Sequence, residues 1–204
     1  LLPGTPIAFV DKLKQNGNLI SAQLDNVLSA AIILYLYQHG FAGTAFFTAQ
    51  EEAGKSWRFV HEWFKKNKIS TDKLVVLDTS PYETREEADK QLVVLRNKDV
   101  NAKFKSPLLK ELKQFCKKNK ISFSCKDKFI IEKNKLREKE GLKPISIGST
   151  ELGRIVMESN GQIQGATLQI PTTGYHTVDE TACVESIKAI IFILSSFYIK
   201  TVNI

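Results

Sequence analysis

The feature that most constrains the fold is a regular alternation of apolar segments over the first eighty residues. Short β-rich runs at 5–10, 43–50 and 73–79 predict strands, whereas the segments 26–40 and 55–67 predict helices. The order strand, helix, strand, helix, strand is typical of a sheet whose parallel strands are joined by helices. We therefore expect an α/β fold, with a mostly parallel mixed sheet covered by helices on both faces.

The rest of the sequence continues this pattern without an internal repeat or a low-complexity linker, so one domain over residues 1–204 is the simplest interpretation. The last predicted helix, at 179–200, has Glu180 in its first turn, where a negative charge favours the helix dipole. Residues 126–144 are charged and predict an exposed loop or helix. Further strands are predicted at 90–97, 120–125 and 166–171, further helices at 106–119 and 146–161, and a loop at 172–180.

The chain carries 29 basic and 22 acidic residues, a net charge of +7, and fourteen lysines lie between Lys98 and Lys143. Such a surface can bind nucleic acid. However, the lysines lack interleaved aromatic residues or glycine motifs, and arginine is scarce. Solvated helix faces explain the lysines better, and we expect no nucleic-acid partner.

Three cysteines, Cys116, Cys125 and Cys183, form no C-x-x-C pair, which is typical of a reducing compartment and favours a cytoplasmic location. The longest apolar run, Ala189–Ile199, falls short of the ~18 residues that cross a membrane, so we expect no membrane partner. The chain begins with Leu rather than Met and carries no signal sequence at its start, so we expect it to begin inside a longer gene product.

Five polar residues follow predicted strands or extended segments. Asp25 precedes a helix, the pair Glu51 and Glu52 follows one strand, Asp78 follows the next, and His176 lies in a loop after a later strand. The carboxyl ends of parallel strands share one edge of a sheet, where ligands bind. Four acids and a histidine at that edge predict a site for a hard metal ion or zinc. Neighbouring glutamates point in different directions, so one can hold a metal while the other acts as a general base.

Each residue also has a simpler interpretation. Asp25 could cap the following helix, Asp78 could be a turn acid, and a lone histidine such as His176 is more often a surface residue than a ligand. His39, at a predicted helix end, fits a cap favoured by the dipole, and His61 fits a structural role within an amphipathic helix.

Five segments together resemble one known family, the tetrahedral (TET-type) glutamyl and deblocking aminopeptidases, which are dinuclear metal exopeptidases. The segments are "LDN" at 24–26, "FFTAQEEAG" at 46–54, "VVLDTSP" at 75–81, "IGSTELG" at 147–153 and "IPTTGYHTVDE" at 170–180. The similarity spans about residues 3–200. It implies a zinc-exopeptidase-like fold and a metal-dependent aminopeptidase, or its catalytic portion, that releases N-terminal residues from peptides.

The resemblance also implies a role for each polar residue. Asp25 would bridge two divalent ions, zinc in the first place or cobalt. Glu52 and His176 would complete the protein ligands of one ion, and Asp78 would bind the other. Glu51 would be the catalytic general base that deprotonates a water held by the metal.

Further implications concern the substrate and the assembly. Thr150, Glu151 and Tyr175 stand in the motifs that would contact a peptide substrate, and the family forms large homo-oligomers. The family's remaining metal histidine lies in an upstream "DGH"-like segment that this sequence does not contain. We therefore expect one incomplete metal site, and a chain without the N-terminal part and the inserted dimerisation domain. The alternative is a non-catalytic relative that retains the fold for binding or assembly.

Overall fold

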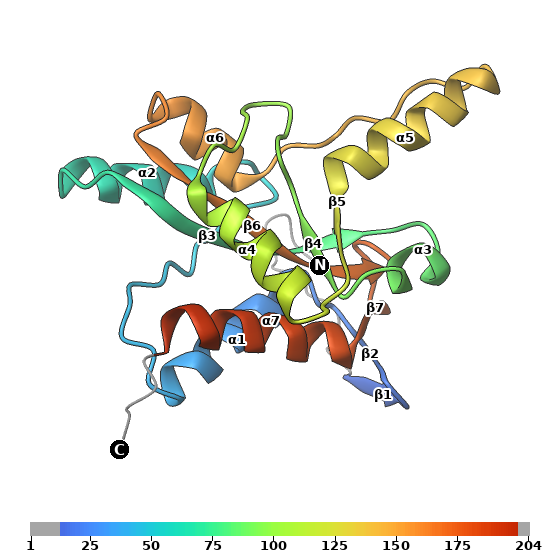
Figure 1. Ribbon diagram of the computed structural model, residues 1–204, viewed down its shortest axis with the longest axis horizontal. Coiled ribbons are helices and arrows are strands. Elements are labelled where there is room, and N and C mark those ends of the chain that lie inside the picture. Colours follow the sequence, from blue (N-terminus) through green and yellow to red (C-terminus); the bar gives the residue numbers. More distant parts are fainter. Residues whose placement is uncertain (1–12, 200–204) are drawn as a thin grey trace, which may run out of the picture.

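A computed structural model describes residues 13–199. The strand predicted at 5–10 lies outside the described residues. The described residues form seven strands and seven helices, which Figure 1 labels in chain order. No helix among them is both long and apolar enough to cross a lipid bilayer.

The strands form one seven-stranded sheet. Its long central strand is β6 (Ile163–Thr173), which pairs in parallel with β3 (Thr71–Pro81). Gly165 permits this close pairing, because a Cβ there would lie 1.9 Å from the carbonyl oxygen of Leu74. The other strands are β1 (Lys14–Asn16), β2 (Leu19–Ala22), β4 (Val93–Leu95), β5 (Phe123–Cys125) and β7 (Glu180–Cys183).

The expected α/β fold with a mixed sheet is confirmed, but only two of the six strand pairings are parallel, fewer than the mostly parallel sheet expected. Parallel pairing joins β3 to β6 and β4 to β5, whereas β1–β2, β2–β7, β6–β7 and β4–β6 are antiparallel. The antiparallel strands β1, β2 and β7 extend the sheet at one end, where β7 links the loop after β6 to the hairpin of β1 and β2. This end carries two of the predicted site residues, because Asp25 follows β2 and His176 precedes β7.

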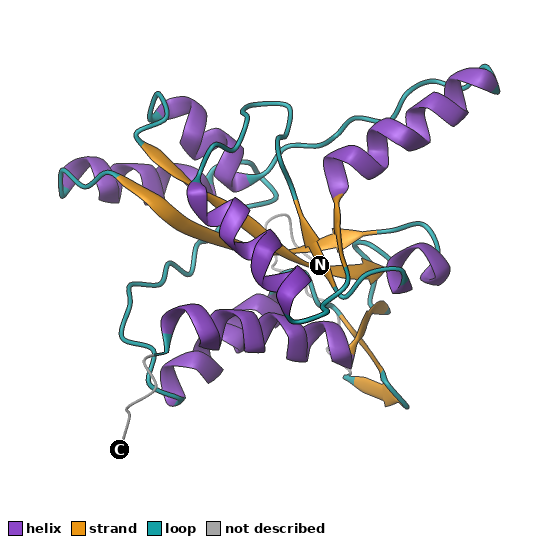
Figure 2. Cartoon of the chain, in the orientation of Figure 1, coloured by secondary structure: helices purple, strands orange, loops and turns teal. Residues whose placement is uncertain are grey.

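The helices form two groups on either side of the long strands in Figure 1. One group packs α7 (Val184–Tyr198) against α1 (Val27–Gln38) and α4 (Pro107–Lys118). The other packs α2 (Ser56–Lys66) against α6 (Glu151–Glu158). Figure 2 shows a short helix, α3 (Arg85–Asp89), and a projecting helix, α5 (Lys126–Lys139).

The sequence signals for helix ends are confirmed in α4. Ser106 caps this helix through its side-chain oxygen, which accepts a hydrogen bond from the Leu108 N–H, and Pro107 occupies the first turn. Residues 126–144, predicted as loop or helix, contain α5. The structure also contains one helix that the sequence analysis did not predict, α3.

Two sequence predictions are wrong. Residues 43–50 form no strand, since Phe46 packs on Trp63 and Phe64 of α2 instead of extending along the sheet. The last helix begins at Val184 rather than near residue 179, because residues 180–183 pair with β2 as strand β7. In both segments tertiary packing decided between conformations that the local pattern allowed.

The main core lies between the sheet and the group of α1, α4 and α7, and Leu112 of α4 is 1% exposed within it. Replacing Leu112 by alanine is expected to lower the free energy of unfolding by about 2–5 kcal/mol, because a cavity adds to the lost burial. Urea unfolding measures this. The matched control is Leu136→Ala on α5, where the side chain is 59% exposed and a change within ~0.5 kcal/mol is expected. Equal effects at both positions would contradict the assigned core.

Candidate metal centre

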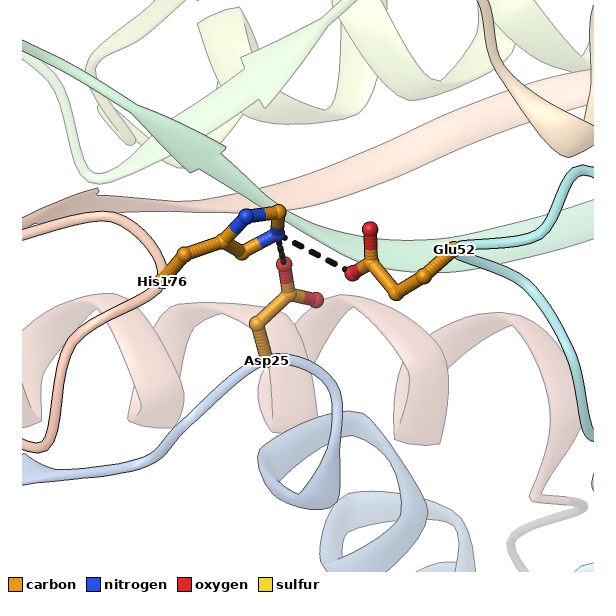
Figure 3. Close-up of side chains that lie close together, drawn as sticks. All are labelled: Asp25, Glu52 and His176. Carbon is orange, nitrogen blue, oxygen red and sulfur yellow. Dashed lines mark hydrogen bonds and ion pairs between the residues drawn. The ribbon is translucent and has the colours of Figure 1, made fainter. Parts of the chain in front are cut away.

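The structure brings Asp25, Glu52 and His176 together (Figure 3). They come from three different places in the chain: the turn between β2 and α1, the turn before α2, and the loop between β6 and β7. His176 Nε2 lies 3.1 Å from Glu52 Oε1 and 3.7 Å from Asp25 Oδ2. One ligand atom from each residue lies within 4.8 Å of the other two.

The geometry of this group fits a zinc ion. Zinc binds nitrogen and oxygen ligands at about 2.0–2.2 Å in a tetrahedron, which places neighbouring ligand atoms about 3.4 Å apart. The two separations from His176 Nε2, 3.1 Å and 3.7 Å, lie on either side of that value. The group also supplies three ligands, the number that the protein contributes at a catalytic zinc site, which leaves a coordination position open.

Glu51 and Glu52 lie in a turn whose backbone is held by hydrogen bonds. The pair lies in a tight turn, in which the Gly54 N–H donates to the Glu51 carbonyl at 2.6 Å and the Lys55 N–H donates to the Gln50 carbonyl at 3.1 Å. Gly54 has a φ of +64°, a conformation that glycine adopts without strain. The two glutamates therefore lie in a turn rather than at the predicted strand end.

Glu51 stands outside the group of three and lines the cavities around it. Burial, followed by the negative charges of Glu52, Asp25 and Glu151, raises the pKa of Glu51, and Arg154 opposes this rise. A carboxylate whose pKa lies above its ordinary range, beside a metal site but not among its donors, has the position and basicity of a proton acceptor.

The Asp25 side chain points toward His176 rather than capping α1 (Figure 3). The structure gives α1 no side-chain cap, and the Asn26 amide donates instead to the Leu77 carbonyl at 2.9 Å. Burial, followed by the charges of Glu180 and Glu52, raises the pKa of Asp25 to about 6. Crowded carboxylates of this kind favour a cation among them.

Asp78 lies beside this group without belonging to it. Its carboxylate accepts hydrogen bonds from the Thr79 N–H at 2.8 Å and from the Gln169 side chain at 3.3 Å. Burial, followed by the charge of Asp25, raises the pKa of Asp78 to about 8. The hydrogen bonds from Thr79 and Gln169 hold the Asp78 carboxylate against strands β3 and β6, which pair in parallel.

The raised pKa of Asp78 predicts how the metal-free chain responds to pH. The folded chain holds this proton to about pH 8, whereas the unfolded chain releases it near its ordinary pKa of 3.8. Between these values the unfolded state binds fewer protons, so stability falls as pH rises, by up to ~1.4 kcal/mol per pH unit. Urea unfolding with a chelator at pH 5 and pH 8 measures the fall. The Asp78→Asn variant lacks this proton, so it should lose less stability; an equal loss in both proteins would contradict the prediction.

The three predicted substrate residues differ in their surroundings. Thr150 is buried and caps α6, with its hydroxyl bonded to Asp99 at 2.8 Å, so this side chain has a structural task. Glu151 is half-buried and accepts a weak bond from Thr48 at 3.4 Å. Tyr175 is exposed and stacks on the ring of His176, with 3.7 Å between the centroids. Its partial burial, followed by the charges of Glu52 and Asp25, raises the pKa of Tyr175.

The other histidines lie away from this group. His39 follows the last residue of α1 and stacks on Tyr35, and its ring Nδ1 lies 2.7 Å from the Tyr35 carbonyl oxygen. His61 lies within α2 near Trp57 and Glu62. His39 is thus the C-cap residue of α1, the position expected for it, and His61 lies within α2, as expected.

Sequence reasoning missed three buried charged residues near the site. Glu180 is 1% exposed and begins β7, so its expected role in a first helical turn is wrong. Arg96 and Lys126 are both buried and line a cavity of about 390 Å³ that also reaches Asp25, Glu51 and Asp78. Lys126 lies over the ring of Tyr82 at 3.5 Å and donates to the Pro81 carbonyl. The lysine-rich composition of its segment concealed it, because most of the surrounding lysines are exposed.

Comparison with known proteins identifies the family to which the chain belongs. The profile of the M42 glutamyl aminopeptidases matches residues 2–134, more than half of the chain. The chain belongs to the M42 glutamyl aminopeptidase family. A search of curated proteins found no significant match.

Solved structures show the M42 fold for nearly the whole chain. An aminopeptidase from the archaeon Desulfurococcus kamchatkensis is 15% identical with a TM-score of 0.67, over 92% of this chain and 51% of that one. A TET aminopeptidase from a marine sediment Thaumarchaeota archaeon is 16% identical with a TM-score of 0.66, over 94% and 51%. The TET1 peptidase of Pyrococcus horikoshii is 17% identical with a TM-score of 0.60, over 93% and 53%. The chain thus spans about half the length of these structures.

Proposed function

We propose that this M42 chain is the catalytic portion of a metal-dependent aminopeptidase that releases N-terminal residues from peptides. The observation that carries the proposal is the convergence of Asp25, Glu52 and His176 beside Glu51, a carboxylate outside the ligand group. Membership of the family supports the same activity. These three ligand residues come from three separate segments of the chain, whereas an acidic cluster at the surface needs no such convergence.

In this proposal, Asp25, Glu52 and His176 hold one divalent ion, for which zinc fits the donor set and cobalt is a second candidate. Asp25 also faces Asp78, so this pair would contribute to a second ion. A bound ion would supply a Lewis acid that lowers the pKa of a water and polarises the scissile carbonyl. Glu51 accepts the proton of the attacking water and passes it to the leaving amine.

The surroundings of the site suit a peptide's N-terminus. Tyr175, stacked on His176, offers a flat exposed face at the entrance, and Glu151 lies beside Glu51. These two residues would contact substrate directly, and Thr150 would act through the cap that places Glu151 at the start of α6. The negative charge of the group would attract the positive amino terminus of a peptide.

The cavity lined by Arg96 and Lys126 supports an acidic residue at the peptide's N-terminus, as the family description suggests. Within the described residues, neither cation pairs with a carboxylate within ion-pair distance. Burial, followed by the charge of Arg96, lowers the pKa of Lys126 to about 7. A substrate carboxylate in this cavity would add a direct partner to the more distant compensation that Glu87 gives Lys126 and Asp78 gives Arg96.

The Lys126→Met variant tests this preference. We expect kcat/KM for a glutamyl substrate to fall by about 10–100-fold, because hydrogen bonds to charged groups are worth ~1.5–3 kcal/mol, while a leucyl substrate is much less affected. The control is Lys128→Met on the same helix, where the side chain is exposed. Equal losses on both substrates in the Lys126 variant would contradict an acidic subsite.

Hydrolysis of aminoacyl-nitroanilides tests the proposed activity, with the full-length protein and this chain assayed side by side after loading with zinc or cobalt. Turnover that a chelator abolishes supports the proposal. A metal-loaded, folded full-length protein without turnover on any aminoacyl substrate would instead favour a non-catalytic relative that keeps the fold for binding or assembly.

We further propose a homo-oligomer that works in the cytoplasm. The Pyrococcus horikoshii relative is described as assembling into a tetrahedron or a large octahedral shell, which supports the oligomer. The three cysteines are free, which is compatible with a reducing compartment. Sedimentation of the full-length protein measures the first point, and a monomer at high concentration would contradict it.

A further inference from the structure

Glu180 connects two of the loops that form the metal centre. Its Oε2 accepts hydrogen bonds from the backbone N–H groups of Leu24 at 2.7 Å and Asp25 at 2.8 Å. Its Oε1 accepts one from the backbone N–H of His176 at 2.7 Å. One carboxylate therefore ties the turn that carries Asp25 to the loop that carries His176.

These contacts are the main compensation for a buried charge. Glu180 is 1% exposed, and among residues 13–199 no lysine, arginine or histidine forms an ion pair with it. A buried carboxylate is costly unless it is hydrogen-bonded, and bonds from N–H groups to a charged acceptor are short and strong. Two of the three donors belong to residues of the metal group itself.

The conformation of the His176 loop makes such a contact necessary. His176 has a φ of +58°, which is uncommon for residues other than glycine and costs free energy unless the surroundings hold it. The N–H of His176 bonds to a carboxylate on β7, and β7 is in turn paired with β2, with Glu180 opposite Ala22. The sheet thus fixes the distance between the two loops.

We propose that Glu180 is a positioning residue that holds the backbones of Asp25 and His176 in the arrangement that a metal ion requires. The inference rests on the proposed function, since it concerns the same centre. Glu180 contacts neither the metal nor the substrate in this role. Glu180 holds the backbone of Asp25 and of His176 in place, and the position of the backbone in turn determines where the carboxylate and the imidazole point.

The Glu180→Gln variant separates this role from general support of the fold. Glutamine keeps the size of the side chain but replaces one acceptor oxygen with an NH₂ group, which cannot accept a hydrogen bond. The backbone N–H groups at one of the two loops therefore lose their acceptor. Zinc affinity, measured by competition with a chromophoric chelator, is expected to fall by about 10–100-fold, as for other partners that orient metal ligands. The zinc-induced rise in Tm should shrink accordingly. A variant that only loosens the fold would lower Tm equally with and without zinc.

The matched control is Glu185→Gln, a change of the same chemistry at an exposed residue that bonds only to Lys188 in the structure. It should bind zinc like the wild type. Equal zinc affinity in Glu180→Gln and the wild type would overturn the inference. If the wild type binds no zinc, the metal-dependent function fails, and the next measurement decides the role of Glu180 by itself.

That measurement needs no metal and no stable variant. Amide hydrogen exchange of the wild-type chain should show slow exchange at Leu24, Asp25 and His176, although all three lie outside helices and strands. In Glu180→Gln, where it folds, at least one of the two loops should exchange faster. Rapid exchange at Asp25 and His176 in the wild-type chain would overturn the proposed link between the loops.

Discussion

Replacing Glu51 by glutamine is expected to lower the proposed aminopeptidase activity by about 10²–10⁴-fold, the usual contribution of a general base. Glutamine preserves the size and hydrogen bonding of the side chain but cannot accept the proton of the attacking water. Asp25, Glu52 and His176 are untouched, so zinc affinity and Tm should stay near wild-type values. The decisive pair of measurements is kcat for an aminoacyl-nitroanilide and zinc content by elemental analysis.

The environment of Glu51 supports this expectation. Its pKa in the metal-free chain is raised by partial burial and then by its acidic neighbours, which favours a role as proton acceptor. Glu62→Gln serves as control, since Glu62 lies on the exposed surface of α2. Unchanged turnover in Glu51→Gln would show that the base is another residue.

Replacing Glu52 by glutamine is expected to weaken zinc binding itself. A neutral amide is a poor ligand for zinc, and only Asp25 and His176 would remain of the group. The loss of affinity should exceed the ~10–100-fold typical of partners that do not touch the metal. Competition with a chromophoric chelator measures it, and activity should return in part at high zinc concentration.

Activity and zinc-binding assays thus distinguish the two neighbouring glutamates. Glu51→Gln should lower the reaction rate while zinc stays bound, whereas Glu52→Gln should weaken zinc binding and lower the rate as a consequence. If both variants lost zinc equally, Glu51 and Glu52 would act as one ligand pair. The geometry of the turn at residues 51–54 would then have to differ from the one described, in which Glu52 alone reaches His176.

Parts of the fold with strong local signals could be predicted from the sequence. The capped helix α4, the amphipathic helix α2 and the apolar strands β3 and β6 each agree with their pattern. The run at 43–50 has the composition of a strand, but a strand also needs a pairing partner, and its aromatic side chains pack on α2 instead. No local pattern contains that information.

The site likewise contains residues that a local sequence pattern indicates and one residue whose role depends on tertiary structure. Acids at the ends of predicted strands pointed to Asp25, Glu52 and Asp78, and the motif around His176 added the imidazole. Glu180 was missed because residues 179–200 have one continuous amphipathic pattern, in which an acid near the start favours a helix cap. Its actual role depends on the pairing of β7 with β2 across more than 150 residues of sequence, which only the fold reveals.

The most direct test is a crystal structure of this chain grown with zinc, with anomalous diffraction used to locate the ion. We expect an anomalous peak about 2.0–2.2 Å from Asp25, Glu52 and His176, with a weaker second peak, or none, toward Asp78. Glu51 should lie within hydrogen-bond reach of the open coordination position without touching the ion. Zinc bound elsewhere, with these three side chains apart, would contradict the proposed centre.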